Sequence, residues 1–173
     1  MTTRTVILGS DRIQARIADL GHEISTDYKD GKLVLMGVLN GAFMFLADLA
    51  RAVDLPMEID FIRVASYGES ASSSGTIKLL KEAELDLTGK DVLLVEDIVD
   101  TGITVNWLRN YFEQHQAGSV KICALIDKKE RREADVHIDY TGFTIMDKGF
   151  LIGYGLDYAG LYRNLPEVYC LEP

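Results

Sequence analysis

Short apolar runs alternate along this sequence with longer segments in which apolar residues recur every three or four positions. Leu33–Leu39 and Val120–Ile126 are two such runs, and nearly every residue in them is apolar, which is typical of strands buried on both faces. A helical pattern over Ala42–Val53 follows the first run, and another from Val105 to near Gly118 precedes the second. Strands that alternate with helices predict an α/β domain with a mainly parallel sheet and right-handed crossovers.

Other segments complete this predicted pattern. Ser10 is expected to cap a helix whose apolar residues recur at helical spacing, at Ile13, Ile17, Leu20 and Ile24. The further strand-like runs are Ile59–Ala65, Val92–Val95, Val136–Tyr140, Phe143–Met146 and Leu151–Tyr154. No internal repeat, low-complexity tract or proline-rich linker interrupts the chain, so residues 1–173 are expected to form a single domain.

Charge and cysteine content narrow the class of protein. The net charge of −9 opposes a general attraction to nucleic acid or to an anionic membrane. The chain contains no apolar run of the ~18 residues that a membrane span requires, and its N-terminus lacks the apolar stretch of a signal peptide. Cys123 and Cys170 lie far apart, which fits reduced structural thiols better than a disulfide framework. We therefore expect a cytoplasmic protein with no nucleic-acid or membrane partner.

The segment Val95–Thr104, with the sequence VEDIVDTGIT, gathers acidic residues at the end of an apolar run. Glu96, Asp97 and Asp100 are carboxylates that are costly to place behind a buried strand unless they have partners. Such groups can accept hydrogen bonds from sugar hydroxyls or face a divalent cation. Solvated acids at a strand end are the alternative interpretation.

The same segment continues into a turn that favours an anion. Thr101, Gly102 and Thr104 stand between the predicted strand and the following helix. At such a turn the backbone N–H groups, the hydroxyls and the helix dipole all favour negative charge. An ordinary helix cap has the same composition, so the turn alone does not identify a phosphate loop.

Polar loops follow three predicted strands, at Asn40–Gly41, Glu96–Thr104 and Asp127–Lys129. Because ligands bind beyond the carboxyl ends of parallel strands, we expect the three loops to line one edge of the sheet. The third loop opens a basic cluster, and charge runs of this kind are typical of a solvated loop. The members of the cluster are Lys128, Lys129, Arg131 and Arg132.

The segment VLLVEDIVDTGIT resembles the phosphoribosyl pyrophosphate (PRPP) binding motif of type I phosphoribosyltransferases, in which two acids precede a T-G-x-T loop. Further matches occur in the family's order at GVLNGAFMFLADL, DFIRVASYG, LIDKKERRE and FLIGYGLDYAGLYRNLPEVY. Together these motifs resemble the hypoxanthine-guanine phosphoribosyltransferases of 6-oxopurine salvage. The resemblance implies the type I fold, a mainly parallel twisted sheet flanked by helices with a small hood formed by the chain ends. It also implies a homodimer or homotetramer.

The resemblance implies a role for each acid of the central motif. Glu96 and Asp97 would bind the ribose hydroxyls of PRPP, directly or through Mg²⁺, and Asp100 would be the general base that faces N7 of the purine. The 5′-phosphate would be held by the loop residues Asp100, Thr101, Gly102, Ile103 and Thr104.

By the same resemblance, a second set of residues would bind the purine. Lys128 would donate to the purine 6-oxygen, since an ammonium group only donates hydrogen bonds and suits a carbonyl rather than an amino group. Phe150 would stack on the ring, and Leu151 would offer backbone contacts to the base edge. Asp157 would complete the purine site and bind a second Mg²⁺.

A third set would hold the pyrophosphate, namely Arg163 with the turn Leu39–Gly41. Many family members carry Lys or Arg in place of Asn40, so backbone N–H groups rather than a side chain would serve there. The family's cis peptide would fall between Leu39 and Asn40. Ile103 stands where relatives often have a polar or basic residue, and we expect its side chain to point away from the phosphate.

The function implied is transfer of the 5-phosphoribosyl group of PRPP to N9 of hypoxanthine or guanine, with Mg²⁺ required. Ser66 and Tyr67 would open a Ser/Gly-rich lid, residues 66–75, that covers the substrates and excludes water. Two alternatives stay open. One is a regulatory protein that senses PRPP or nucleotides on the same fold, and the other is a xanthine-preferring transferase.

Overall fold

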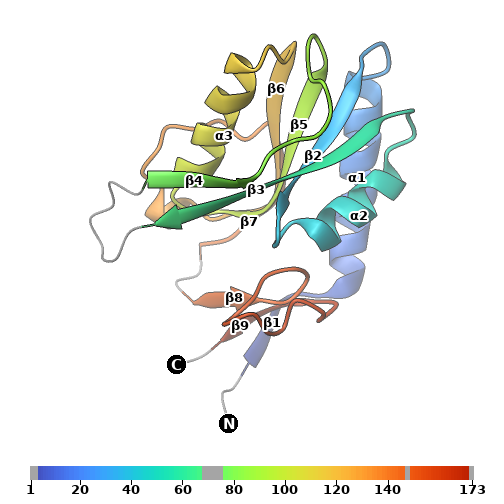
Figure 1. Cartoon of the computed structure of the whole chain (residues 1–173). Coiled ribbons are helices and arrows are strands. Elements are labelled where there is room, and N and C mark those ends of the chain that lie inside the picture. The colour runs from blue at the N-terminus through green and yellow to red at the C-terminus, as the bar shows by residue number, and fades with distance from the viewer. Residues whose placement is uncertain (1–3, 68–75, 147–148, 172–173) are drawn as a thin grey trace.

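The structure, a computed structural model, describes residues 4–67, 76–146 and 149–171. These residues form two sheets, and the larger has its strands in the order β4-β3-β2-β5-β6-β7 (Figure 1). Neighbouring strands are parallel throughout this sheet except for β3 and β4, which are antiparallel. The strands are β2 (Leu33–Leu39), β3 (Glu58–Tyr67), β4 (Thr76–Lys81), β5 (Asp91–Val99), β6 (Ser119–Asp127) and β7 (Tyr140–Thr144). The predicted α/β class with a mainly parallel sheet is confirmed.

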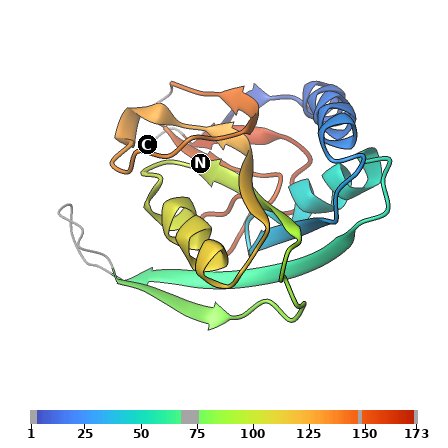
Figure 2. The ribbon, with the colours of Figure 1, turned by 90° about the horizontal axis from the view of Figure 1, so that it is seen from above.

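Helices cover both faces of the larger sheet. Helices α1 (Ser10–Asp27) and α2 (Phe43–Ala52) lie together on one side, and α3 (Ile103–Gln114) lies on the other (Figure 2). Side chains of β2 alternate between the two layers, because successive residues of a strand point to opposite faces. Leu35 packs in the cluster with α1 and α2, whereas Met36 packs in the cluster with α3. Burial on both faces explains why the apolar runs in the sequence are continuous.

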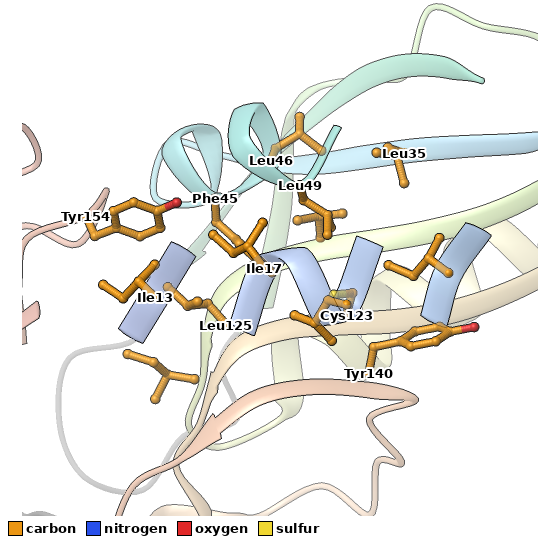
Figure 3. Close-up of a cluster of buried hydrophobic side chains, with 14 of the residues drawn as sticks. Ile13, Ile17, Leu35, Phe45, Leu46, Leu49, Cys123, Leu125, Tyr140 and Tyr154 are labelled. Atoms are coloured by element: carbon orange, nitrogen blue, oxygen red, sulfur yellow. The ribbon is translucent and has the colours of Figure 1, made fainter. Parts of the chain in front are cut away.

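Helix α1 forms the middle of the thicker layer. Its Ile13 and Ile17 lie between α2, which contributes Phe45 and Leu49, and the strand β6 with Leu125 (Figure 3). All five of these side chains are at most 2% exposed. The helical spacing of apolar residues seen in the sequence is therefore the face that joins α2 to the sheet.

The chain ends meet in the smaller sheet. Strands β1 (Arg4–Leu8), β9 (Val168–Leu171) and β8 (Phe150–Ile152) pair antiparallel in the order β1-β9-β8. This sheet stands apart from the larger one in Figure 1, and it is the hood that the family resemblance implied. Within the described part of the chain, no helix combines the length and the apolar character needed to cross a membrane.

Two predicted strands, Val136–Tyr140 and Phe143–Met146, were wrong in their bounds, since a single strand, β7, spans Tyr140–Thr144. Asp139 bonds to Ile122 twice at 2.9 Å, through its main-chain N–H and through its carboxylate. One of these two bonds uses a side-chain acceptor in place of a main-chain one, and regular strand pairing begins only at Tyr140.

The predicted cap of α1 was also wrong. The N-cap position is Gly9, and no side chain caps the helix. Ser10 is the first helical residue, and its main-chain N–H donates to Oε1 of Glu167 at 3.4 Å. A residue near the other end of the chain thus supplies the acceptor that the local sequence was expected to supply. The strands β1, β4 and β9 were not predicted.

Candidate active site

The three polar loops lie together at the carboxyl edge of the larger sheet, as predicted. A cavity of about 560 Å³ lies there. It is lined by residues of β5, by the loop after β6, and by residues between 149 and 157, which include part of β8 in the smaller sheet. A second cavity of about 250 Å³ lies against the turn that precedes α3. Ile98 and Asp100 line both cavities, so the two spaces adjoin at these residues.

Glu96 and Asp97 belong to β5 itself, which continues to Val99 rather than ending at Val95 as predicted. Each is 8% exposed. Burial raises the pKa of Glu96 well above its usual range, and the neighbouring Asp97 charge raises it further. Burial also raises the pKa of Asp97, although the Ile98 N–H, which donates to its Oδ1 at 2.8 Å, acts in the opposite direction. Two buried carboxyl groups side by side form a pair that favours an added cation or hydrogen-bond donor.

The turn from Asp100 to Thr104 wraps the smaller cavity. Gly102 has a φ of 81°, in the left-handed region, and a Cβ atom there would lie 2.8 Å from Cγ1 of Val136. Only glycine fits this position without strain. Thr101, Gly102 and Thr104 line the cavity, and Ile103 begins α3 without lining it. The structure therefore brings a turn of the kind that favours an anion and a helix N-terminus to one space.

Asp100 stands where the two cavities meet. Its Oδ2 forms an ion pair with Arg131 at 3.3 Å. Its Oδ1 is shielded from solvent and has no hydrogen-bond partner among the described residues. An orphaned acceptor at the boundary of two cavities is suited to a ligand that spans both.

Lys128 and Phe150 both line the larger cavity. Lys128 is 8% exposed, and its Nζ donates to the carbonyl oxygen of Gly149 at 2.9 Å. Phe150 is 53% exposed, and its ring packs against Tyr158 edge-to-face with centroids 5.4 Å apart. Leu151, next along β8, is buried and also lines the cavity. A cation and an exposed aromatic ring thus border one space that is large enough for a flat heterocycle.

Asp157 also lines the larger cavity and is joined to Arg163. Arg163 pairs with Oδ1 of Asp157 at 2.7 Å and donates to the carbonyl oxygen of Gly155 at 2.6 Å. A Cβ atom at Gly155 would collide with the carbonyl oxygen of Gly41, and one at Gly41 would collide with the carboxylate of Asp97. The backbone at Gly155, to which Arg163 donates, therefore lies against the turn after β2, and that turn lies against Asp97 of β5.

The turn after β2 has the expected backbone. The peptide between Leu39 and Asn40 is cis, as the resemblance implied. Asn40 is exposed, and neither Asn40 nor Gly41 is among the residues that line the two cavities. Ser66 and Tyr67 end β3, where their main chains pair with β4. The rest of the predicted lid, residues 68–75, lies outside the described part of the chain.

Comparisons with known proteins agree with this geometry. A family model described as phosphoribosyl transferase domain matches residues 7–159. The hypoxanthine phosphoribosyltransferase of Salmonella typhimurium is 46% identical over 96% of this chain and 94% of its own length. The chain belongs to the hypoxanthine-guanine phosphoribosyltransferase family.

Other members of the family support the same assignment. The hypoxanthine-guanine phosphoribosyltransferase of Aquifex aeolicus is 45% identical over 96% of this chain and 94% of its own length. A crystal structure of the Staphylococcus aureus hypoxanthine phosphoribosyltransferase superposes with a TM-score of 0.94 at 38% identity, covering 98% of this chain and 91% of that one. The family resemblance, the type I phosphoribosyltransferase fold and the assignment as a phosphoribosyl-transferring enzyme are confirmed.

The basic cluster was interpreted wrongly in part. Arg132 is not solvated, because its side chain is 19% exposed and forms an ion pair with the buried Asp127. Arg131 is exposed but pairs with Asp100. An acid placed directly after a buried strand, as Asp127 is, signals a nearby partner, and this signal was available in the sequence. Tyr158 against Phe150 was also missed, because their spacing carries no signal of contact.

Proposed function

We propose that this member of the hypoxanthine-guanine phosphoribosyltransferase family transfers the 5-phosphoribosyl group of PRPP to N9 of hypoxanthine or guanine. The products are IMP or GMP and pyrophosphate. The observation that carries this proposal is the pair of cavities that adjoin at Asp100. One is bordered by an anion-binding turn and the other by a cation and an exposed aromatic ring. A reaction that joins a sugar phosphate to a flat base requires both.

In this proposal the 5′-phosphate of PRPP binds in the smaller cavity. Backbone N–H groups of the turn, the hydroxyls of Thr101 and Thr104 and the positive end of α3 would hold it. Ile103 does not line this cavity, so it would contribute only its main chain. The ribose then lies toward Glu96 and Asp97, whose carboxylates accept hydrogen bonds from its hydroxyls.

Glu96 and Asp97 would hold one Mg²⁺ and Asp157 a second, each together with the substrate. Carboxylate oxygens are ligands that Mg²⁺ prefers, and the ion is usually bound by one or two carboxylates and substrate phosphates rather than by a complete protein cage. The described residues contain no cluster of three or more acidic, histidine or cysteine side chains that could hold a metal alone. Bound Mg²⁺ would supply Lewis-acid neutralisation of the leaving pyrophosphate.

The purine would occupy the larger cavity. Lys128 would donate to the 6-oxygen, and because one of its three protons already goes to Gly149, its ammonium group has a fixed direction. Phe150 would stack on the ring, and the main chain of Leu151 would contact the base edge. A donor-only group at the 6-position selects a carbonyl against the amino group of adenine.

Asp100 would act as the general base. Its Oδ1 has no partner among the described residues and stands between the two cavities. It would accept the purine proton from N7 while N9 attacks C1 of the ribose and the bond from C1 to pyrophosphate breaks. Arg163 and the backbone of Asn40 and Gly41 would stabilise the departing pyrophosphate.

The test is the release of pyrophosphate from PRPP and Mg²⁺ with hypoxanthine, guanine, xanthine or adenine supplied in turn. We expect turnover with hypoxanthine or guanine and at most a trace with adenine. A preference for xanthine would identify the alternative transferase. No turnover with any base, together with tight binding of PRPP or nucleotides, would contradict the proposal and favour a sensing protein.

A further inference from the structure

Arg132 joins the segment after β6 to the phosphate turn. It follows the short 3-10 helix η1 (Lys129–Arg131). Its Nε donates to the carbonyl oxygen of Asp100 at 3.0 Å, and one of its terminal nitrogens donates to the carbonyl oxygen of Val99 at 3.4 Å. The same nitrogen pairs with Oδ1 of Asp127, which is 4% exposed. A single guanidinium group therefore connects a buried acid to two carbonyls of the turn.

Main-chain donors extend this connection by one residue. The N–H groups of Glu133 and Ala134 donate to the carbonyl oxygen of Thr101 at 2.9 and 3.0 Å. The N–H of Lys128 donates to the carbonyl oxygen of Val99 at 2.9 Å. Three successive carbonyls, from Val99 to Thr101, are thus all held by residues 128–134.

The direction of these carbonyls decides where the turn's donors point. In a trans peptide the N–H points opposite to the C=O of the same unit, and the described cis peptide lies elsewhere, at Leu39–Asn40. When the carbonyls of Val99, Asp100 and Thr101 face residues 128–134, the N–H groups of residues 100–102 face the other way. That side holds the smaller cavity, which Asp100, Thr101 and Gly102 line.

We propose that Arg132, oriented by Asp127, is a positioning residue that aims the N–H groups of the phosphate turn at the 5′-phosphate of PRPP. This inference rests on the proposed function, because it names the ligand of the smaller cavity. Arg132 touches no substrate in this account. Arg132 acts by orienting the carbonyl groups of the turn, and Asp127 acts by orienting Arg132.

The chain offers a matched control for this role. Lys129 also pairs with the Asp127 carboxylate, at 3.6 Å, but its side chain is 60% exposed and, within the described residues, donates to no carbonyl of the turn. Arg132→Ala and Lys129→Ala therefore each remove one cation from the same acid, and only the first removes donors from the carbonyls of Val99 and Asp100.

The experiment measures the KM for PRPP, the KM for hypoxanthine and kcat for both variants and for the wild type, with calorimetric titration of ribose 5-phosphate as a probe that needs no turnover. We expect Arg132→Ala to weaken PRPP and ribose 5-phosphate about 10- to 100-fold, the effect of losing charge-assisted hydrogen bonds. The KM for hypoxanthine stays within about twofold, and guanidinium ion restores part of the affinity for ribose 5-phosphate. Lys129→Ala matches the wild type.

Arg132→Lys and Asp127→Asn give a second reading if Arg132→Ala is poorly folded. Lysine reaches one acceptor instead of several, so we expect an intermediate loss of ribose 5-phosphate affinity. Asp127→Asn and Arg132→Lys combined should lose less than the sum of the two single effects, because both act through one contact.

Two results would overturn the inference. One is unchanged ribose 5-phosphate affinity in folded Arg132→Ala or Arg132→Lys, and the other is an equal rise of the KM for PRPP and for hypoxanthine. Failure of the proposed function has a different signature, which is absence of transfer by the wild-type enzyme. In that case the ribose 5-phosphate titration still decides whether Arg132 shapes the turn.

Discussion

Buried carboxyl groups lie on β3, β5 and β6 of the larger sheet, and those of β3 and β5 differ in how they are satisfied. Asp60 on β3 accepts hydrogen bonds from the N–H groups of Phe61, Glu84 and Leu85 at 2.6–2.9 Å and pairs with Lys81 at 3.7 Å. Burial alone would raise the pKa of Asp60, but these partners outweigh it and lower the pKa.

Glu96 and Asp97 on β5 lie in the opposite situation. Each has the other's carboxyl group beside it, and burial raises the pKa of both. Asp100 nearby has a buried oxygen without a partner among the residues described. The acid of β3 is satisfied within the chain, whereas the acids of β5 and its turn have fewer partners there, which is the pattern expected if a ligand supplies the rest.

The largest effect is expected from Asp100→Asn, which keeps the size of the side chain and removes its ability to accept a proton. We expect kcat to fall about 10²- to 10⁴-fold, the usual contribution of a general base. The PRPP affinity should stay within a few-fold, and steady-state kinetics with a PRPP titration measures both. Unchanged kcat would remove Asp100 from the role of base.

A smaller loss is expected when the acids of β5 are neutralised together in Glu96→Gln/Asp97→Asn. We expect kcat/KM for PRPP to fall at least about 10-fold, since charge-assisted bonds to the ribose or to Mg²⁺ are lost. The free energy of unfolding without ligand should not fall, because two desolvated like charges are removed. Chemical denaturation checks this, and a loss of stability would show that the pair has a structural role.

The opposite pattern is expected for Asp60→Asn, which replaces one acceptor by a donor facing the N–H groups of Glu84 and Leu85. We expect the free energy of unfolding at pH 7 to fall by about 1–3 kcal/mol, the cost of buried donors left unpaired. Turnover per folded molecule should match that of the wild type. A variant as stable as the wild type would contradict the claim that Asp60 is held by partners within the chain, unlike the acids of β5.

The stability effect of Asp60 should depend on pH in a defined direction. A carboxyl group with a lowered folded pKa contributes stability that is fully present above the unfolded pKa of about 3.9 and is lost as the pH falls through the folded pKa. The gap in stability between wild type and Asp60→Asn should therefore narrow as the pH is lowered from 5 toward about 2. Denaturant titrations across that range measure the gap, and a gap that widens in acid would contradict the assignment.

The sequence predicts the central part of the fold because local pattern and burial agree there. Leu33–Leu39 has the predicted bounds, and six of its seven residues are buried. The strands that were not predicted are exposed or alternating, as in β4 (Thr76–Lys81), where exposed and half-buried residues alternate. β1 and β9 are short strands that gain their stability from each other across the whole length of the chain, and no local pattern reports such a pairing.

The candidate site also has one part that the sequence predicts and another that it does not. The anion turn and its acids are adjacent in sequence, so their chemistry could be predicted from one segment. Contacts such as Arg132 with the carbonyl oxygen of Asp100, or Tyr158 with Phe150, depend on how distant loops meet. Positive φ values at Tyr154, Ala159 and Tyr162 shape the loop that carries Asp157, and tyrosine and alanine give no sequence signal for that conformation.

The central claim is that the β5 acids are held for a ligand, and ligand-induced stabilisation tests it most directly. The measurement is the thermal midpoint Tm of the wild type, Asp60→Asn and Glu96→Gln/Asp97→Asn, each with and without saturating PRPP and Mg²⁺. A ligand at about 100 times its Kd adds roughly 2.7 kcal/mol, or about 5–10 °C for a chain of this size. We predict that rise in the wild type and in Asp60→Asn, and about half of it or less in Glu96→Gln/Asp97→Asn, whose affinity is at least about 10-fold weaker. An equal rise in all three proteins would contradict the claim.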